Sequence, residues 1–175
     1  MMIDPFLKAC HEYGLVIDAN MLNVFIVGMK NKNDISNNRS TENYCAEDFD
    51  NMYILFDYCK QIILSPYILP EVSNTLPLDY KAKNDNDDRH SLFLKEALTF
   101  FKMERVKEEH EPYREIIDKK FFYKFGITDT AIIDLAEKGY AILSDDGPLV
   151  GFLVNNNYPA KRPSGLQAQR LLASV

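Results

Sequence analysis

The stretch GITDTAIIDLAEKGYAILSDDGPLVGFLV, residues 126–154, decides the fold class because it carries a helix pattern and a strand pattern in immediate succession. Thr128 is expected to cap a helix over 129–138, and Gly139 is expected to end that helix. The apolar residues 140–143 then predict a buried strand. A helix that leads directly into a buried strand is typical of an α/β protein.

The same alternation continues on both sides of this stretch. The residue pattern predicts strands at 15–17, 62–64 and 158–161, and helices at 20–29, 49–58, 67–75, 91–108, 113–122 and 149–154. The dipeptide Ser65-Pro66 is a helix-start signal for the third of these helices. We therefore expect a three-layer α/β/α fold around a central, mostly parallel sheet of four to five strands.

The chain has 175 residues, of which 46% are hydrophobic and 12% aromatic, as in a folded protein with a substantial core. No repeat or second domain is apparent, so one domain over 1–175 is expected. Two parts stand out within it: a polar stretch around 30–48, interpreted as an exposed insertion, and a helical segment around 81–122 that opens with a charged connector. The net charge of −6 excludes attraction of nucleic acid by bulk positive charge.

The cysteines and histidines do not predict a zinc site or a disulfide framework. Cys10, Cys45 and Cys59 lack metal-type spacing, and the three histidines are scattered. Reduced thiols in a cytosolic protein are the expectation. No apolar run reaches the roughly 18 residues of a membrane span, and the first residues lack a signal-peptide core. A cytoplasmic protein without a membrane partner is therefore expected.

Acidic residues far apart in the chain occur where an apolar run ends or a helix begins: Asp18, Glu71, Asp129 and the pair Asp145-Asp146. If the apolar runs are neighbouring parallel strands, these carboxylates meet at one edge of the sheet. Carboxylate oxygens are the ligands that Mg²⁺ and Mn²⁺ prefer. The pattern therefore predicts a site for Mg²⁺ or Mn²⁺ and metal-assisted hydrolysis.

Four short motifs in this order resemble those of PIN-domain ribonucleases. They are Val16-Ile17-Asp18-Ala19-Asn20, Leu69-Pro70-Glu71-Val72, Gly126-Ile127-Thr128-Asp129-Thr130-Ala131-Ile132-Ile133 and Leu143-Ser144-Asp145-Asp146. The resemblance implies a PIN-like fold and metal-dependent cleavage of a phosphodiester, usually in RNA. The chain departs from it at Leu149, where many members carry a further acid, and in the long segments around 30–48 and 81–122.

The resemblance also implies a role for each acid. Asp18, Asp129 and Asp146 would bind the metal ion, and Glu71 would bind a second ion or orient a metal-bound water. Asp145 is the alternative ligand at the fourth position, but the motif spacing favours Asp146. Consecutive strand residues point to opposite faces, so both are not expected to face the metal unless the chain turns after the strand.

Three polar neighbours complete the candidate site. Asn20 could donate a hydrogen bond to a ligand carboxylate or to the scissile phosphate, and Thr130 and Ser144 could fix the neighbouring carboxylates. Because the clustered acids repel one another, at least one of their pKa values should rise without metal.

Each acid also has a structural interpretation. Asp129 could simply interact with a helix dipole, Glu71 could be a solvated helix residue, and Asp145-Asp146-Gly147 could be an ordinary turn. Asp18 is harder to explain this way, because it directly follows a buried apolar run.

Two basic segments could contact nucleic acid. Lys119, Lys120 and Lys124 alternate with Phe121, Phe122 and Tyr123, a composition that can bind phosphates and stack bases; the alternative is a solvated helix face with its aromatic residues in the core. Lys161-Arg162 is the second such segment.

The leading hypothesis is an endoribonuclease that hydrolyses RNA, as a candidate toxin of a toxin–antitoxin pair, with an antitoxin protein and a second copy of the chain as candidate partners. The alternative is a catalytically inactive PIN-like binding or scaffolding module, which Leu149 favours. A haloacid dehalogenase-type phosphatase needs a second Asp where Asn20 stands. A receiver domain needs its acidic pair early in the chain, whereas Asp145 and Asp146 come late.

Overall fold

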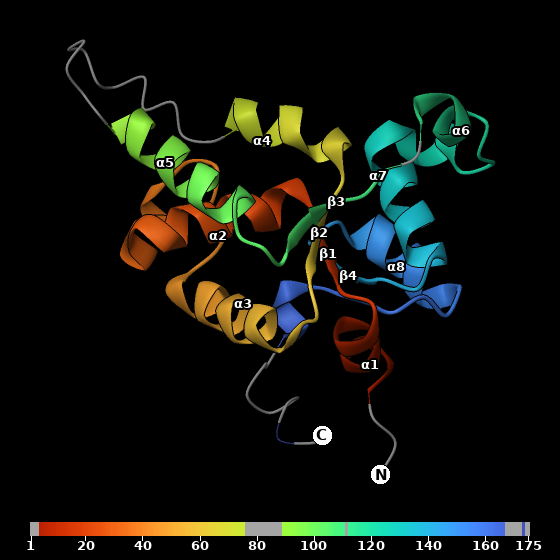
Figure 1. The fold of residues 1–175 in the computed structure, drawn as a ribbon, viewed down its shortest axis with the longest axis horizontal. Helices are drawn as coiled ribbons and strands as arrows, with labels where there is room; N and C mark the ends of the chain where they lie inside the picture. The colour runs from red at the N-terminus through yellow and green to blue at the C-terminus, as the bar shows by residue number, and fades with distance from the viewer. Residues whose placement is uncertain (1–3, 76–88, 111, 167–172, 174–175) are drawn as a thin grey trace.

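The computed structural model of the chain describes residues 4–75, 89–110, 112–166 and 173. The charged connector expected before residue 89 lies outside this part of the chain. The described strands form one five-stranded sheet in which every neighbouring pair is parallel. Helices cover both faces of this sheet (Figure 1). The expected three-layer α/β/α fold with a parallel sheet is therefore confirmed.

The sheet has the strand order β3-β2-β1-β4-β5, with the first strand at its centre. The strands are β1 Leu15–Ile17, β2 Ile62–Leu64, β3 Val106–Glu108, β4 Ala141–Leu143 and β5 Ala160–Lys161. The chain therefore builds outward from β1 to one edge, returns to the centre and builds outward to the other edge. The point at which it changes direction lies between β1 and β4. Ligand sites of open parallel sheets lie at the carboxyl ends of the strands at such a point.

The helices divide between the two faces as this order requires. They are α1 Pro5–Glu12, α2 Ala19–Asn31, α3 Ala46–Tyr58, α4 Leu69–Thr75, α5 Arg89–Phe101, α6 Tyr113–Ile117, α7 Phe122–Glu137 and α8 Gly147–Asn155. In Figure 1, α2, α3 and α5 lie on one side of the sheet, and α1, α7 and α8 lie on the other. Right-handed crossovers put the helices on opposite faces once the chain reverses its direction across the sheet.

The three central strands are buried along their whole length. Every residue of β1, β2 and β4 is buried, which is why each strand appears in the sequence as a continuous apolar run. An aromatic cluster on the α2 side completes the core, where the Phe25 ring centroid lies 4.3 Å from that of Phe56 and 5.2 Å from that of Phe100. Burying each such side chain stabilises the fold by about 1.5–3 kcal/mol.

The helix expected over 91–108 is wrong in its second half. α5 ends at Phe101, and Val106–Glu108 forms β3, which pairs with β2. β3 lies at the edge of the sheet, where Val106 is half-buried and the two residues after it are exposed. An edge strand of this kind has no continuous apolar run, so the sequence pattern did not distinguish it from the end of a helix.

Two other helix boundaries also differ from the expectation. The helix that ends before Gly139 starts directly after Gly126 and not at Asp129, because α7 consists of two helical parts that meet at Gly126, where φ is 73° and ψ is −175°. Thr128 therefore lies inside the second part and does not cap it. The helix expected over 113–122 ends at Ile117. A glycine with positive φ interrupts a helix at no steric cost, and this allows the two halves of α7 to take different directions.

The polar stretch around 30–48 is not simply an exposed insertion. Residues 30 and 31 end α2, and Lys32–Asn37 form a 3-10 helix whose Ile35 is fully buried. The buried Thr41 hydroxyl donates a 2.7 Å hydrogen bond to the Ile35 carbonyl. This segment therefore contributes to the core although most of its residues are polar.

Ser65 is the cap of a 3-10 turn, Pro66–Ile68, before α4 begins at Leu69. Glu71 therefore lies in the first turn of α4 and not in the second turn of a longer helix. Among the described residues, no helix is both long and apolar enough to cross a membrane.

Candidate functional site

The centre of the sheet brings the first and fourth acidic motifs together. β1 and β4 are hydrogen-bonded neighbours, with Ile17 paired to Leu143 at their carboxyl ends. Asp18 follows directly on β1, and Ser144, Asp145 and Asp146 follow on β4. The Asp145 backbone N–H donates a 3.1 Å hydrogen bond to Asp18 Oδ2. This contact fixes the two motifs against each other.

Asp18 also begins the helix that follows β1. Its Oδ1 accepts a 2.8 Å hydrogen bond from the Met21 N–H, so it is the N-cap of α2. Burial raises the pKa of Asp18, and hydrogen bonds from the Ser144 hydroxyl and from the two backbone N–H groups offset this rise only in part. The negative charge of Asp145 raises the pKa further. Asp18 is thus a buried carboxyl group whose charged form is disfavoured by its burial.

Asp145 and Asp146 differ clearly in their surroundings. Asp145 Oδ1 accepts hydrogen bonds from Arg162 Nη2 at 2.6 Å and Nε at 3.1 Å, and its Oδ2 accepts one from the Tyr44 hydroxyl at 3.0 Å. Asp146 is exposed, and its Oδ1 accepts a 2.7 Å hydrogen bond from the Leu149 N–H that it caps. The carboxylate of Asp146 is therefore more available to bind a ligand than that of Asp145.

The pKa of Asp129 responds to the charges of acids at the three other motif positions. It is the third residue after the Gly126 kink and so lies in the first turn of the second half of α7. Burial, followed by the negative charges of Asp146, Asp18 and Glu71, raises the pKa of Asp129 to about 6. The predicted rise of a pKa among the acids is therefore present at this residue.

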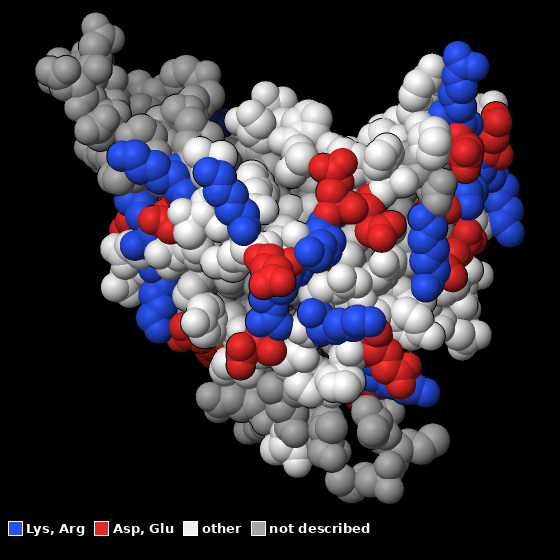
Figure 2. Space-filling model, viewed as in Figure 1, with Lys and Arg blue, Asp and Glu red and all other residues white. Residues whose placement is uncertain are grey.

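Glu71 approaches the same edge of the sheet from the other side. It is exposed on α4, the helix that follows β2. In Figure 1, α4 and α7 lie apart at the top of the molecule, and Figure 2 shows a notch in the surface between them. The charge of Glu71 is close enough to raise the pKa of Asp129. Glu71 and Asp129 thus come from the two helices between which this notch lies.

The carboxylates do not form a ready-made coordination shell. Among the residues that the structure describes, no three His, Cys, Asp or Glu side chains are grouped so that they could hold a metal ion. The charges of Asp146, Asp18 and Glu71 nevertheless add to the effect of burial on the pKa of Asp129, so these acids lie close enough to repel one another. Hard oxygen donors that repel one another match the chemistry of a divalent cation, which would remove the repulsion.

The three polar neighbours differ in how they relate to the acids. Ser144 is fully buried, bonds to Asp18 and accepts a 3.1 Å hydrogen bond from the Asp146 N–H. Thr130 is buried, and its hydroxyl has no hydrogen-bond partner among the described residues. Asn20 is exposed in the first turn of α2. Ser144 therefore joins two of the motifs, and Thr130 has an unused donor beside Asp129.

The sequence did not indicate that Tyr44 and Arg162 contact Asp145. Arg162 was noted only as part of a basic dipeptide, and Tyr44 lies in the polar stretch around 30–48. These residues are 17 and 101 positions from Asp145, and no local pattern connects them. The structure thus adds a cation and a phenol to the surroundings of the fourth motif.

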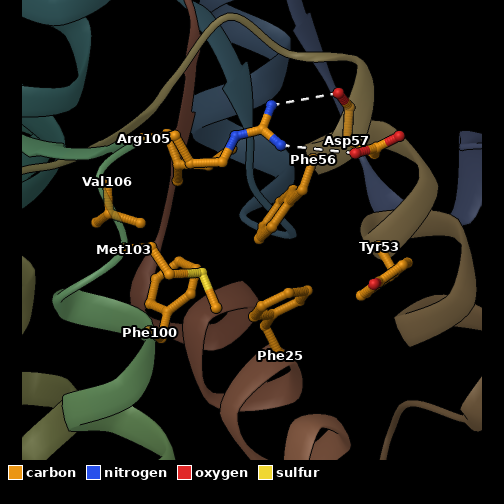
Figure 3. A pocket seen from close by; sticks show the side chains of 9 residues that line it. Phe25, Tyr53, Phe56, Asp57, Phe100, Met103, Arg105 and Val106 are labelled. Atoms are coloured by element: carbon orange, nitrogen blue, oxygen red, sulfur yellow. Dashed lines mark hydrogen bonds and ion pairs between the residues drawn. The ribbon is translucent and has the colours of Figure 1, made fainter.

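A cavity of about 140 Å³ lies away from these acids. Figure 3 shows it near the amino-terminal ends of β2 and β3, lined mainly by Phe25, Tyr53, Phe56, Phe100 and Met103. At its rim, Arg105 Nη2 donates a 3.2 Å hydrogen bond to the Asp57 carbonyl, and Arg105 Nη1 lies 3.7 Å from the Asp57 carboxylate. Its apolar lining provides none of the carboxylates of the candidate site.

Comparison with known proteins supports the fold and goes no further. No family model matches the chain, and no curated protein matches it. The crystal structure of PAE2754 from Pyrobaculum aerophilum is similar, with a TM-score of 0.51 and 16% sequence identity. The similarity covers 91% of this chain and 95% of that one. At this identity the similarity concerns the fold alone.

Proposed function

We propose that this protein is a metal-dependent endoribonuclease of the PIN type that hydrolyses RNA phosphodiester bonds in the cytoplasm. The observation that carries the proposal is the pKa of about 6 at Asp129, which is raised by burial and then by the charges of Asp146, Asp18 and Glu71. A pKa that is raised by burial together with specific charges from separate elements is a feature of functional sites. These are also the acids of the four PIN-like motifs.

The proposed chemistry uses each residue where it lies. A bound Mg²⁺ or Mn²⁺ ion would neutralise the phosphodiester and lower the pKa of a bound water. Asp18, Asp129 and Asp146 would hold the ion, and Glu71 would hold a second ion or orient the water. The Ser144 hydroxyl would keep Asp18 in place.

Three more residues would act around these ligands. Asn20, exposed in the first turn of α2, would donate a hydrogen bond to the scissile phosphate. Thr130 would fix the carboxylate next to it in the chain. Asp145 would remain with Arg162 and Tyr44 and stay outside the ligand set. A role as a toxin, with an antitoxin or a second copy of the chain as its protein partner, is part of the same proposal.

The second candidate function is a PIN-like module that binds without catalysis. Two observations favour it. The described residues contain no group of three side chains that could hold a metal ion, and the position of a further family acid is occupied by Leu149, which is fully buried. Titration with Mn²⁺ in a calorimeter separates the two candidates, because a module without a metal site would show no binding in the millimolar range.

Asp18→Asn tests the nuclease proposal directly. Asn is as good an N-cap as Asp, so the variant should keep α2 in place while removing one negative ligand. Wild type and variant are incubated with structured and unstructured RNA and Mn²⁺, with Glu104→Gln as a control at an exposed carboxylate beyond the amino end of β3. We expect cleavage by wild type and by Glu104→Gln, and none by Asp18→Asn. Equal cleavage by all three proteins would mean that a contaminating nuclease is responsible.

A further inference from the structure

The start of α7 presents an aromatic ring almost completely to solvent. Tyr123 is 95% exposed, whereas its neighbours Phe121 and Phe125 pack against Phe152, with ring centroids 4.9 and 5.1 Å from it. The Tyr123 ring contacts the edge of the Phe122 ring, with centroids 5.9 Å apart, so it is held on one side and open to solvent on the other. The expected alternative, in which all of these aromatic residues lie in the core, does not apply to Tyr123.

Two lysines close to Tyr123 in the sequence, Lys120 and Lys124, each lie over the ring of another aromatic residue. Lys120 Nζ is 4.7 Å from the centroid of the Phe121 ring, and Lys124 Nζ is 4.8 Å from that of Phe125. Hydrogen bonds from the N–H groups of Lys124 and Phe125 to the Phe121 carbonyl fold the segment into one helical turn. Both ammonium groups therefore lie over aromatic residues that are close to Tyr123 in the sequence.

Neither Lys120 nor Lys124 forms an ion pair with an acid in the described part of the chain. Lys119 differs, because it bonds to the buried Asp134 and lies 3.5 Å from Glu137. In a chain of net charge −6, two ammonium groups without an ion-pair partner in the described residues, three positions before and one position after an exposed ring, provide local positive charge for an anion with an aromatic part. Figure 2 shows Lys and Arg side chains, interleaved with acids, over the α6–α7 end of the molecule.

We propose that Lys120, Tyr123 and Lys124, together called the α7 strip, bind single-stranded RNA and lead it to the acids. Tyr123 stacks on one unpaired base, and the two lysines bind phosphates on either side of it. This inference rests on the proposed nuclease function, because the same helix carries Asp129. Tyr123 and Asp129 are six positions apart in the chain, so their Cα atoms are at most about 20 Å apart. A duplex is a poor ligand for this strip, since its bases are already stacked.

Binding is measured without cleavage by following the fluorescence anisotropy of a labelled, unstructured RNA of about twelve nucleotides in EDTA. The same sequence as a duplex is the comparison. We expect the wild type to bind the single strand more tightly than the duplex. Tyr123→Ala should weaken single-strand binding about tenfold, and Tyr123→Phe should restore it, since stacking needs the ring and not the hydroxyl. Tyr53→Ala, at another exposed tyrosine on α3, is the matched control.

The lysines have their own signature. Lys120→Gln with Lys124→Gln should reduce the slope of log K against log salt concentration by about 1.4, because each phosphate contact with a single strand contributes about 0.7. A merely structural role of these side chains would not change this slope. The variants are not expected to unfold, because Tyr123 and both lysines lie at the surface.

The outcomes distinguish failure of the RNA-binding proposal for the α7 strip from failure of the proposed nuclease function. If Asp18→Asn abolishes cleavage while Tyr123→Ala changes neither binding nor cleavage, the strip is wrong and the nuclease stands. If Tyr123→Ala weakens single-strand binding but no metal-dependent cleavage is found, the strip stands and the catalytic function fails. If Tyr123→Ala leaves RNA binding unchanged but alters self-association in solution, the strip is a protein contact and the RNA proposal is overturned.

Discussion

Neutralising Asp129 should make the metal-free protein more stable. Its pKa of about 6, against 3.8 for an ordinary Asp, corresponds to about 3 kcal/mol at most. The side chain is only partly buried, and solvent screening reduces this figure, so about 1–1.5 kcal/mol is the realistic gain for Asp129→Asn. For a chain of this length, that gain raises the melting temperature by about 2–6 °C.

The sign and the pH range follow from the direction of the shift. Because the pKa is raised in the folded state, the native protein binds more protons than the unfolded chain between about pH 4 and 6, so stability falls as the pH rises through this range. The penalty is complete above the folded pKa and absent below about pH 4. Thermal melts of wild type and Asp129→Asn are compared at steps between about pH 4 and 7.5. The difference between their melting temperatures should grow as the pH rises to about 6 and stay constant above it.

Two comparisons complete the experiment. Glu104→Gln removes an exposed carboxylate far from the acids and should leave the melting temperature unchanged at every pH. Millimolar Mn²⁺ should stabilise the wild type near neutral pH but have little effect on Asp129→Asn, because the cation would relieve the same repulsion. An Asp129→Asn protein that is less stable than wild type near pH 7.5, or a difference that does not depend on pH, would refute the reasoning.

Three further predictions concern the core and the thiols. Ile35→Ala should lower the free energy of unfolding by about 2–4 kcal/mol in chemical denaturation, because Ile35 is fully buried; a loss of a few tenths would mean that its segment is not core. Gly28→Ala should cost about 1–3 kcal/mol by the same measurement, since its Cβ would lie 2.1 Å from the Phe49 ring, whereas Gly151→Ala, with open space around it, should not destabilise. A thiol reagent should modify one cysteine rapidly in the native protein and three after unfolding, because Cys45 is exposed while Cys10 and Cys59 are buried; three fast thiols in the native state would contradict the structure.

The buried centre of the fold could be predicted from the sequence, but its edge could not. β1, β2 and β4 are covered on both faces, so their residues must all be apolar and appear as uninterrupted runs. β3 is stabilised by pairing with β2 through backbone hydrogen bonds. These bonds do not require apolar side chains. Its sequence, Val106–Glu108, therefore carried one apolar residue and no strand signal.

The candidate site was predictable to a similar extent. Asp18 follows directly on β1 and Asp146 comes three residues after the end of β4, and this local relation is visible in the sequence. The partners of Asp145 were not visible, because Tyr44 reaches it from 101 positions away. The choice between Asp145 and Asp146 rested on motif spacing alone, and the hydrogen bonds from Arg162 and Tyr44 now give a physical reason for preferring Asp146.

Among the acids, Asp129 is the strongest argument for a function. Asp18 and Asp146 each cap a helix, so their presence would be explained by stability even in a protein without a site. Asp129 lies in the first turn of the second half of α7, where the helix dipole favours a negative charge, but no hydrogen bond reaches its carboxylate from the residues that the structure describes. Its charge instead opposes folding near neutral pH, because burial and three other acids raise its pKa to about 6. A residue that costs stability and makes no compensating contact is most simply explained by a ligand that uses its charge, and a divalent cation is the ligand whose charge would turn this cost into binding.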